Sequence, residues 1–403
     1  NVGRRSGRGS GNGTPESRMD SRRPQICGIV PVKKPMRIGI DATGLGAPKT
    51  GTVAYLTEIL AKWNEDPSIL HEFYIFASPK RAHHFKDLGL DGRFRFINAP
   101  DNRNLRVLWQ QTLMPLLMLW KRLDVHWGPG FVLPLISPLP MVVTIHDLTF
   151  ELFPEVHETI KRFYFPAMIR GAVKKARRVL AISRTTMGDL NRLLPDSRGK
   201  TEVTLLAARS LGRAEAPPAG APEHYALFLG TLEPRKNLKR LLAAWNGLGS
   251  EVRGPMHLVV VGATGWMIDE LLVGAGERSD VIFAGQVTDA QLAQWMKGAQ
   301  FLVYPSLYEG FGLPVVEAMA AGVPVLTSNV GATLEIAEGV AWLVDPLSEE
   351  SIRIGLQRLI GDADLRNSLA KKGLERAAEF SWGKTARQTL DAIELAGQLQ
   401  PHA

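Results

Sequence analysis

The sequence predicts an α/β protein with two domains, each built around a parallel β-sheet. The chain has 403 residues, which is longer than a domain with a single hydrophobic core usually is. Apolar runs of strand length alternate with helical stretches, which is typical of parallel sheets. This alternation stops at 207–223, a segment rich in Ala, Pro and Gly, and then starts again. We therefore expect domains over 36–206 and 224–382, joined by a linker.

The first domain is expected to begin with a strand and a glycine-rich loop. Residues 43–52 form that loop, and a helix over 53–63 follows it. Ser183 directly precedes another helical stretch and is the expected N-cap. The expected strands of this domain are 36–40, 73–76, 94–97, 125–127, 141–145 and 179–183.

The second domain repeats this pattern. Its expected strands are 225–229, 257–261, 281–283, 301–304, 323–327 and 341–344, and its clearest helices are 238–245 and 289–297. A last helix is expected within 383–403. Residues 1–24 are rich in Arg, Gly and Ser and carry few large apolar side chains, so we expect a disordered basic tail.

Charge divides the chain into two unlike halves. Residues 1–200 carry 31 Lys and Arg against 17 Asp and Glu, which gives +14, and residues 201–403 carry 17 against 23, which gives −6. A basic half suits an anionic membrane, a diphosphate-bearing acceptor or nucleic acid, although a solvated charged face explains it equally well. The basic amphipathic stretch 160–178 could lie on a membrane surface or be an ordinary core helix.

The compartment is predicted from cysteine content and hydropathy. A single cysteine, Cys27, excludes an internal disulfide and fits a reducing compartment. No apolar run reaches the roughly 18–20 residues that cross a bilayer. We therefore expect a cytoplasmic protein that can contact the inner face of the plasma membrane.

Two glutamates around a glycine turn form the most informative motif. Glu309 and Glu317 flank a stretch with two glycines and Pro314, directly after the expected strand 301–304. Proline suits a helix start, so the motif predicts a strand, a loop and a helix whose first N–H groups favour a phosphate. Carboxylates beside a phosphate site suit the hydroxyl groups of a sugar and a ribose.

Two further motifs lie at the ends of expected strands. Arg235 and Lys236 follow a strand and Pro234, where two cations suit a diphosphate. A surface pair at a helix start is the alternative, but cations are disfavoured there. His146 and Asp147 follow the strand 141–145, at the edge where α/β proteins bind ligands, although a strand-end histidine is often structural.

Four blocks in order resemble one enzyme family. Residues 304–314 with Glu317 are similar to the donor-site signature of retaining glycosyltransferases of family 4, the bacterial mannosyltransferase-like set. Residues 230–238, 144–148 and 380–382 resemble that family's phosphate loop, histidine segment and C-terminal helix entry. The resemblance implies two Rossmann-like domains facing a cleft, the GT-B fold. It also implies that the C-terminal helix within 383–403 crosses back to the N-terminal domain.

The resemblance also implies roles for individual residues. The catalytic set would be His146, Arg235, Lys236 and Glu309. The donor-binding set would be Gly51, Gly230, Arg235, Lys236, Gly262, Val287, Glu309, Gly310, Phe311, Gly312, Leu313 and Glu317. Glu309 would contact the donor sugar, Glu317 the ribose, and the two cations the diphosphate. Val53 and Ala54 depart from the family's loop pattern, which weakens the acceptor assignment; the acceptor candidates are Arg103, Arg106, Trp109 and Asp147.

The resemblance points to transfer of a sugar, with mannose as the best candidate, from a nucleotide-diphosphate sugar such as GDP-mannose. The acceptor would be a saccharide or a polyprenyl-diphosphate-linked saccharide in cell-surface polysaccharide synthesis. No metal is expected, because the sequence has neither a Cys/His cluster nor a suitably placed Asp-x-Asp element. Two alternatives stay open: a nucleotide-sugar epimerase of similar fold, and a non-catalytic protein that binds nucleic acid through its basic tail.

Overall fold

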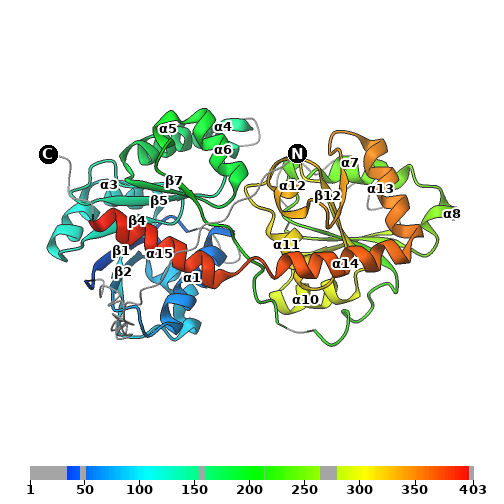
Figure 1. Ribbon diagram of the computed structural model, residues 1–403, viewed down its shortest axis with the longest axis horizontal. Helices are drawn as coiled ribbons and strands as arrows, with labels where there is room; N and C mark the ends of the chain where they lie inside the picture. Colours follow the sequence, from blue (N-terminus) through cyan, green and yellow to red (C-terminus); the bar gives the residue numbers. More distant parts are fainter. Residues whose placement is uncertain (1–33, 46–50, 154–158, 213, 264–278, 399–403) are drawn as a thin grey trace, which may run out of the picture. The chain divides into compact units, whose positions relative to one another are not determined.

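Two parallel sheets organise the chain (Figure 1). The computed structural model describes residues 34–45, 51–153, 159–212, 214–263 and 279–398. The first sheet has the strand order β3-β2-β1-β4-β5-β6-β7 and the second has β10-β9-β8-β11-β12-β13. Neighbouring strands are parallel throughout both sheets. The predicted α/β fold class is confirmed, whereas the predicted tail 1–24 lies outside the described residues.

The strands are short and mostly buried. Those of the first sheet are β1 (Arg37–Asp41), β2 (Glu72–Ala77), β3 (Phe94–Asn98), β4 (Val125–Gly128), β5 (Met141–Ile145), β6 (Arg178–Ala181) and β7 (Thr201–Val203). Those of the second sheet are β8 (Tyr225–Leu229), β9 (His257–Val261), β10 (Val281–Gly285), β11 (Phe301–Tyr304), β12 (Val325–Ser328) and β13 (Trp342–Val344). Every predicted strand is present; β7 was missed, because this half-buried edge strand has no apolar run.

Helices connect the strands of each sheet. Those of the first half are α1 (Gly51–Glu65), α2 (Pro79–Ala82), the 3₁₀ helix η1 (His83–Leu88), α3 (Arg103–Trp120), α4 (Thr149–Leu152), α5 (Thr159–Lys175), α6 (Arg184–Leu193) and η3 (Pro195–Ser197). Those of the second half are η4 (Pro234–Lys236), α7 (Leu238–Asn246), α8 (Ser250–Arg253), α10 (Asp289–Gly298), α11 (Leu313–Ala320), α12 (Gly331–Ala337), α13 (Glu349–Gly361), α14 (Ala363–Ala377) and α15 (Trp382–Gln398). Ser183 caps α6, as predicted, by accepting a hydrogen bond from the amide of Thr186.

The strand order fixes where a ligand can bind. In each sheet the chain first builds outward to one edge and then returns to the other side of its first strand. Connections therefore leave the sheet in opposite directions from β1 and β4, and likewise from β8 and β11. The crevice at the carboxyl ends of such a strand pair is the usual binding position in open α/β sheets.

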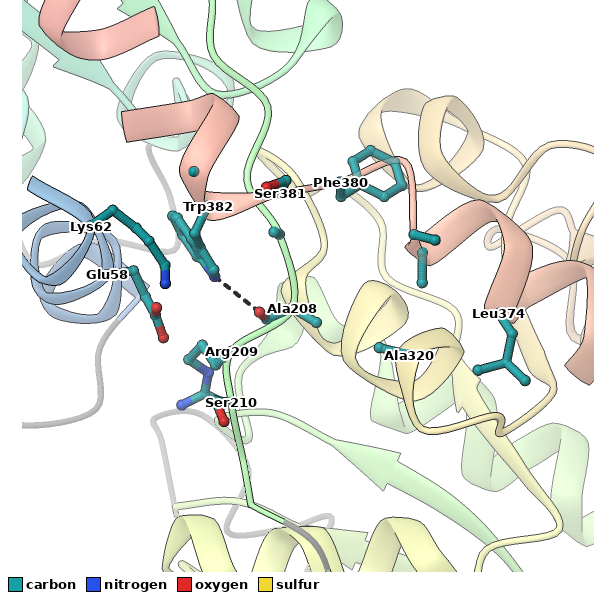
Figure 2. A pocket seen from close by; sticks show the side chains of 14 residues that line it. Glu58, Lys62, Ala208, Arg209, Ser210, Ala320, Leu374, Phe380, Ser381 and Trp382 are labelled. Carbon is teal, nitrogen blue, oxygen red and sulfur yellow. Dashed lines mark hydrogen bonds between the residues drawn. The ribbon is translucent and has the colours of Figure 1, made fainter. Parts of the chain in front are cut away.

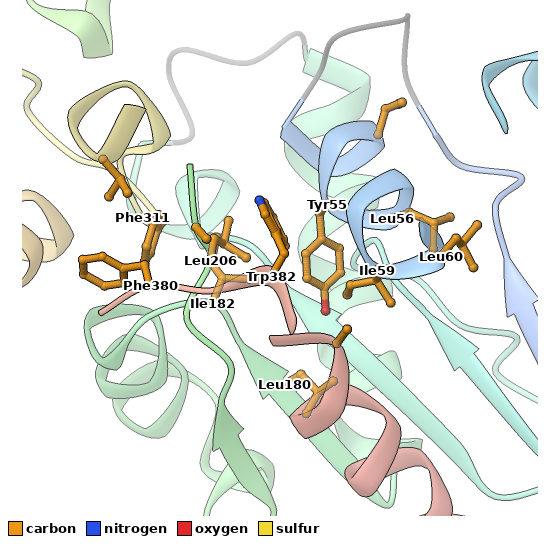
Figure 3. Close-up of a cluster of buried hydrophobic side chains, with 14 of the residues drawn as sticks. Tyr55, Leu56, Ile59, Leu60, Leu180, Ile182, Leu206, Phe311, Phe380 and Trp382 are labelled. Carbon is orange, nitrogen blue, oxygen red and sulfur yellow. The ribbon is translucent and has the colours of Figure 1, made fainter. Parts of the chain in front are cut away.

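The last helix packs on the first half of the chain. Helix α15 lies against α1 and against strands β4 and β5. Two indole groups fasten it: Trp63 donates to the carbonyl of Ala386 at 3.0 Å, and Trp382 donates to that of Ala208 at 2.9 Å. Figure 3 shows Trp382 beside Tyr55 of α1, within one buried apolar cluster. The burial of this large aromatic surface holds α15 in place.

Helix α5 falls on the segment for which membrane contact was one of two expectations. Its apolar residues Met168, Ile169, Ala172 and Val173 are buried, and the last three join the core of the first sheet. Lys174 and Lys175 are exposed. The apolar stripe of α5 therefore packs against the protein, and the core-helix alternative is correct for it.

Candidate active site

The two predicted cations lie between β8 and α7, in the short helix η4. Lys236 is buried although it carries an amine, and its side chain runs along Gly230, where a Cβ would meet it at 3.5 Å. Gly230 itself has a φ of 146°, a conformation that favours glycine. Arg235 is half-buried and donates to the carbonyl of Tyr308 at 2.8 Å. Both cations thus stand at the carboxyl end of β8, beside the loop that leaves β11.

Glu309 is the common partner of both cations. It accepts from Nη1 of Arg235 at 2.8 Å and from Nζ of Lys236 at 2.7 Å. The hydroxyl of Tyr304 donates to the same carboxylate at 2.8 Å. Burial opposes ionisation, but the charges of Arg235 and Lys236 outweigh it and lower the pKa of Glu309 to about 2. Glu309 is therefore a carboxylate at neutral pH and can only accept hydrogen bonds.

A second carboxylate balances the charge of the pair. Glu233 accepts from Nη2 of Arg235 at 2.5 Å. Burial by itself would lower the pKa of Arg235. The negative charges of Glu309, Glu233 and Asp147 outweigh this effect, so the pKa is raised. An arginine has five N–H donors, and Arg235 uses three of them in the described contacts. A lysine has three, and Lys236 uses two. The remaining three N–H donors have no partner among the described residues.

The N-terminus of α11 follows Glu309 closely in the chain, and the start of α1 lies near the side chain of Leu313, with which α11 begins. Gly312 precedes α11 with a φ of 102°, and no side chain caps this helix. Gly51 begins α1, and a Cβ on it would lie 3.9 Å from Leu313, the first residue of α11. Helix N-termini carry unsatisfied N–H groups and partial positive charge, so these positions favour an anion. Phe311, predicted as donor-binding, is instead buried edge-on against Phe380 at 5.8 Å.

The remaining predicted glycines and Val287 lie at the ends of neighbouring strands. A Cβ on Gly262 would lie 1.9 Å from the carbonyl oxygen of Gly230, so the loops after β8 and β9 touch through their backbones. Val287 follows β10 and is half-buried against the core. Residues 264–278, which come shortly after the end of β9, lie outside the described residues.

His146 faces the second half of the chain from the end of β5. Its Nε2 lies 2.7 Å from the carbonyl oxygen of Pro129, and burial lowers the pKa of the ring. The neutral ring must then carry its proton on Nε2, which leaves Nδ1 as a hydrogen-bond acceptor. A Cβ on Gly310 would lie 1.9 Å from the carbonyl oxygen of His146. Thr186 reinforces this approach by donating to the carbonyl of Gly310 at 3.1 Å.

The acceptor candidates do not form one group. Asp147 lies beside His146 but accepts from the amide and hydroxyl of Thr149, so it caps a turn. Trp109 packs edge-on against Phe76 at 6.0 Å, in a small apolar cluster. Arg106 is half-buried and Arg103 exposed, both on α3. None of the contacts between described residues joins Arg103, Arg106 or Trp109 to His146 or Asp147, so the predicted acceptor set splits into two places.

Glu317 has a partner that sequence reasoning missed. It is 2% exposed on α11 and accepts from Nε and Nη2 of Arg209 at 2.5 and 3.2 Å. Arg209 lies in the predicted linker, whose patternless composition gives no signal for an ion pair. Tyr304 and Glu233 were also missed, although both stand inside motifs that had been singled out.

Arg209 also borders the one cavity described. This cavity of about 480 Å³ lies where two chain segments cross between the sheets, 207–210 and 380–383 (Figure 2). Figure 2 shows Glu58 and Lys62 of α1 on one side, and Ala320 of α11 and Leu374 of α14 on the other. Burial raises the pKa of Glu58, although the positive charge of Lys62 acts in the opposite direction. Within the described ranges no cluster of three metal-ligating side chains was found.

Known proteins share both the sequence motifs and the fold. The family profile described as "Glycosyl transferases group 1" matches residues 215–376, the segment that carries Arg235, Glu309 and Glu317. Residues 215–376 thus form a group 1 glycosyltransferase segment. This match favours a glycosyltransferase over the epimerase alternative.

Individual relatives of this glycosyltransferase span nearly the whole chain. The O-antigen chain mannosyltransferase B of Escherichia coli is 29% identical over 89% of this chain and 100% of its own length. The structure of Anabaena HepE with UDP and glucose has a TM-score of 0.68 at 17% identity, covering 88% of this chain and 98% of that one. The structure of WaaG, a glycosyltransferase involved in lipopolysaccharide biosynthesis, also has a TM-score of 0.68 at 17% identity. It covers 88% of this chain and 99% of that one. These structures confirm the predicted GT-B fold.

Proposed function

We propose that this glycosyltransferase transfers mannose from GDP-mannose to a saccharide or polyprenyl-diphosphate-linked saccharide. The sugar would keep its anomeric configuration, and the product would belong to a cell-surface polysaccharide. The full-length similarity to an enzyme named O-antigen chain mannosyltransferase B supports the choice of mannose. The expected place of action is the cytoplasmic face of the plasma membrane.

One observation carries the donor assignment: Glu309 holds Arg235 and Lys236 together and is followed closely in the chain by the N-terminus of α11. The donors left free on the two cations, together with the first N–H groups of α11, suit the two phosphates of a nucleotide diphosphate. Negative charge grows on that diphosphate as the sugar leaves. Preorganised cations and dipoles stabilise this charge more in the transition state than in the bound donor, which is how they would accelerate transfer.

The other polar groups would orient the sugar and the ribose. Glu309 is ionised and already holds two cations, so its lone pairs suit sugar hydroxyls better than attack on the anomeric carbon. The Nδ1 atom of His146 offers a further acceptor from the opposite sheet. Glu317 on α11 would accept from the ribose hydroxyls, next to Arg209.

We also propose that the reaction needs no metal ion. Hydrogen-bond donors for the diphosphate are available from Arg235 and Lys236, although Glu309 and Glu233 balance their charge, and the N-terminus of α11 adds partial positive charge. Activity in the presence of EDTA tests this directly, because a metal-dependent transferase would lose its turnover.

A nucleotide screen followed by product analysis tests the whole proposal. Thermal unfolding of the purified protein would be compared with GDP-, UDP-, ADP- and dTDP-sugars, and a rise with GDP-mannose is expected. Transfer to a mannose-containing oligosaccharide would then be followed by mass spectrometry, with the configuration of the new bond read by NMR. A rise with UDP-sugars alone would refute GDP-mannose as donor, and an inverted product would refute retention.

A further inference from the structure

Helix α3 carries a row of large apolar side chains that the protein does not cover. Leu108 and Leu116 are each 61% exposed, and Trp120 is 72% exposed. The full row, called here the α3 apolar face, consists of Leu105, Leu108, Leu113, Leu116, Leu119 and Trp120. Single exposed leucines are ordinary, but a contiguous row marks a surface that another apolar phase covers.

The geometry of α3 separates this row from the core. Met114, Pro115 and Met118 are buried and pack toward the first sheet. Within the row, positions 105 and 108, 113, 116 and 119, and 116 and 120 are three or four apart, and the rotation of the helix places all six on the side opposite Met114 and Met118. Helix α3 thus has two opposed apolar faces. The buried face is sufficient to hold the helix on the protein, and the exposed face is available to a partner.

The neighbouring loop extends the exposed surface. Leu135 donates its amide to the side chain of Gln111 on α3 at 2.8 Å, and the same side chain donates to the carbonyl of Leu133 at 3.3 Å. These bonds fix the loop beside the helix. Ile136, the next residue along the chain, is 80% exposed. The loop bonded to α3 therefore also exposes a large apolar side chain.

Basic residues outnumber acidic ones at the ends of the α3 apolar face, where Asp101 and Asp124 are the nearest carboxylates in the sequence. Helix α3 contains no Asp or Glu, while Arg103 and Arg106 lie in its first turn and Lys121 and Arg122 follow its end. The ammonium group of Lys121 lies 4.1 Å from the centre of the Trp120 ring. Cations and a tryptophan at the rim of an apolar surface suit the boundary between anionic headgroups and acyl chains.

We infer that the α3 apolar face docks on an anionic lipid bilayer, with α3 lying in the plane of the interface. This deepens the proposed function, because it names the surface from which a lipid-linked acceptor would be taken. Among the described helices, none is long and apolar enough to cross a membrane. A second copy of the chain fits the face less well, because it would set the same four basic residues against themselves. Anionic lipids supply the opposite charge.

Flotation with vesicles tests this inference without any nucleotide or acceptor. The full chain would be mixed with vesicles of phosphatidylcholine containing 30% phosphatidylglycerol, or of phosphatidylcholine alone. We expect binding to the anionic vesicles that is at least tenfold stronger than to the neutral ones and that weakens in high salt. The double variant Leu108→Gln/Leu116→Gln should lose at least tenfold in binding. The matched double variant Leu347→Gln/Ile354→Gln, which removes exposed apolar residues from the second half, should bind like the parent.

Three outcomes would overturn the inference: no binding of the parent chain to anionic vesicles, equal binding to both vesicle types, or equal loss in both double variants. Sedimentation without vesicles covers the remaining alternative, since a parent dimer that becomes monomeric in Leu108→Gln/Leu116→Gln and binds no vesicles would assign the face to a second copy. Melting temperatures would show whether each variant is folded. Failure here is separate from failure of the proposed function, which would appear as loss of the GDP-mannose thermal shift in the absence of lipid.

Discussion

Arg209 and Glu317 form a two-point ion pair between the linker and helix α11. The carboxylate is buried, whereas the guanidinium also lies 3.6 Å from Asp289 of α10. Burial raises the pKa of Glu317, and the bonds from Arg209 oppose that rise. The carboxylate proposed for the ribose is therefore held in place, before any nucleotide arrives, by a side chain from the segment that joins the two sheets.

The ribose role of Glu317 predicts a defined nucleotide preference. Replacing Glu317 by Gln should weaken GDP binding about tenfold, or about 1.4 kcal/mol, because a charged acceptor for the ribose hydroxyls becomes a neutral one. Calorimetric titration would compare GDP with 2′-deoxy-GDP. The parent should prefer GDP, and the variant should discriminate less. An unchanged preference in Glu317→Gln would place the ribose elsewhere.

Removal of Arg209 should destabilise the protein strongly. Arg209→Ala leaves the Glu317 carboxylate buried without its partner, and such losses cost about 3–5 kcal/mol. Urea unfolding would measure the change. Arg387→Ala is a suitable control, because Arg387 forms an exposed pair with Asp391 at 3.6 Å and exposed pairs are worth about 0–1 kcal/mol. Equal effects of the two substitutions would show that Arg209 does not stabilise Glu317.

Arg235→Ala should act on turnover. Loss of one preorganised donor to a developing oxyanion typically costs about 10²–10³ in kcat, and we expect a loss of that size with GDP-mannose. Arg240 provides the control, because it lies one turn further on and binds the side chain of Asn237 at 3.0 Å. Arg240→Ala should stay within about twofold of the parent. A rise in KM with unchanged kcat in Arg235→Ala would instead indicate uniform donor binding.

His126 predicts a pH dependence of stability. Burial lowers its pKa from 6.5 to about 4, with Asp41 opposing, and neither ring nitrogen has a hydrogen-bond partner among the described residues. The unfolded chain takes up a proton near pH 6.5 and the folded chain does not, so stability is lost as pH falls from 6.5 to 4. The loss amounts to about 3 kcal/mol from a shift of that size. Unfolding free energies of the parent and His126→Leu, measured between pH 7 and 4, should diverge over that window; parallel curves would contradict the assignment.

The approach of Gly310 to His146 predicts an effect of one methyl group. Gly310→Ala would place a Cβ 1.9 Å from the carbonyl oxygen of His146, so the contact between the two halves must open. We expect a fall in turnover of at least tenfold, because the donor site would lose its His146 side. Gly361→Ala is the matched control, with nothing within 4 Å of its Cβ. Full activity of Gly310→Ala would show that this contact is not needed for transfer.

Much of the candidate site could be predicted because it lies inside short sequence motifs. Arg235, Lys236, Glu309 and Glu317 follow strands whose apolar pattern is plain, and parallel strands bring their carboxyl ends to one edge. The acceptor side could not be predicted in the same way. Trp109 belongs to an apolar cluster and Asp147 caps a turn, because aromatic and acidic side chains serve packing and capping as readily as binding.

By itself the sequence determined the α/β class, the positions of the strands and the glycosyltransferase motifs, since periodicity and turn chemistry are local properties. Tertiary structure alone decided three things: that Arg209 holds Glu317, that α5 buries its apolar stripe, and that α3 leaves one exposed. Each depends on which faces of distant segments meet. Local patterns show that a face is apolar or charged, but only packing decides whether the protein itself covers that face.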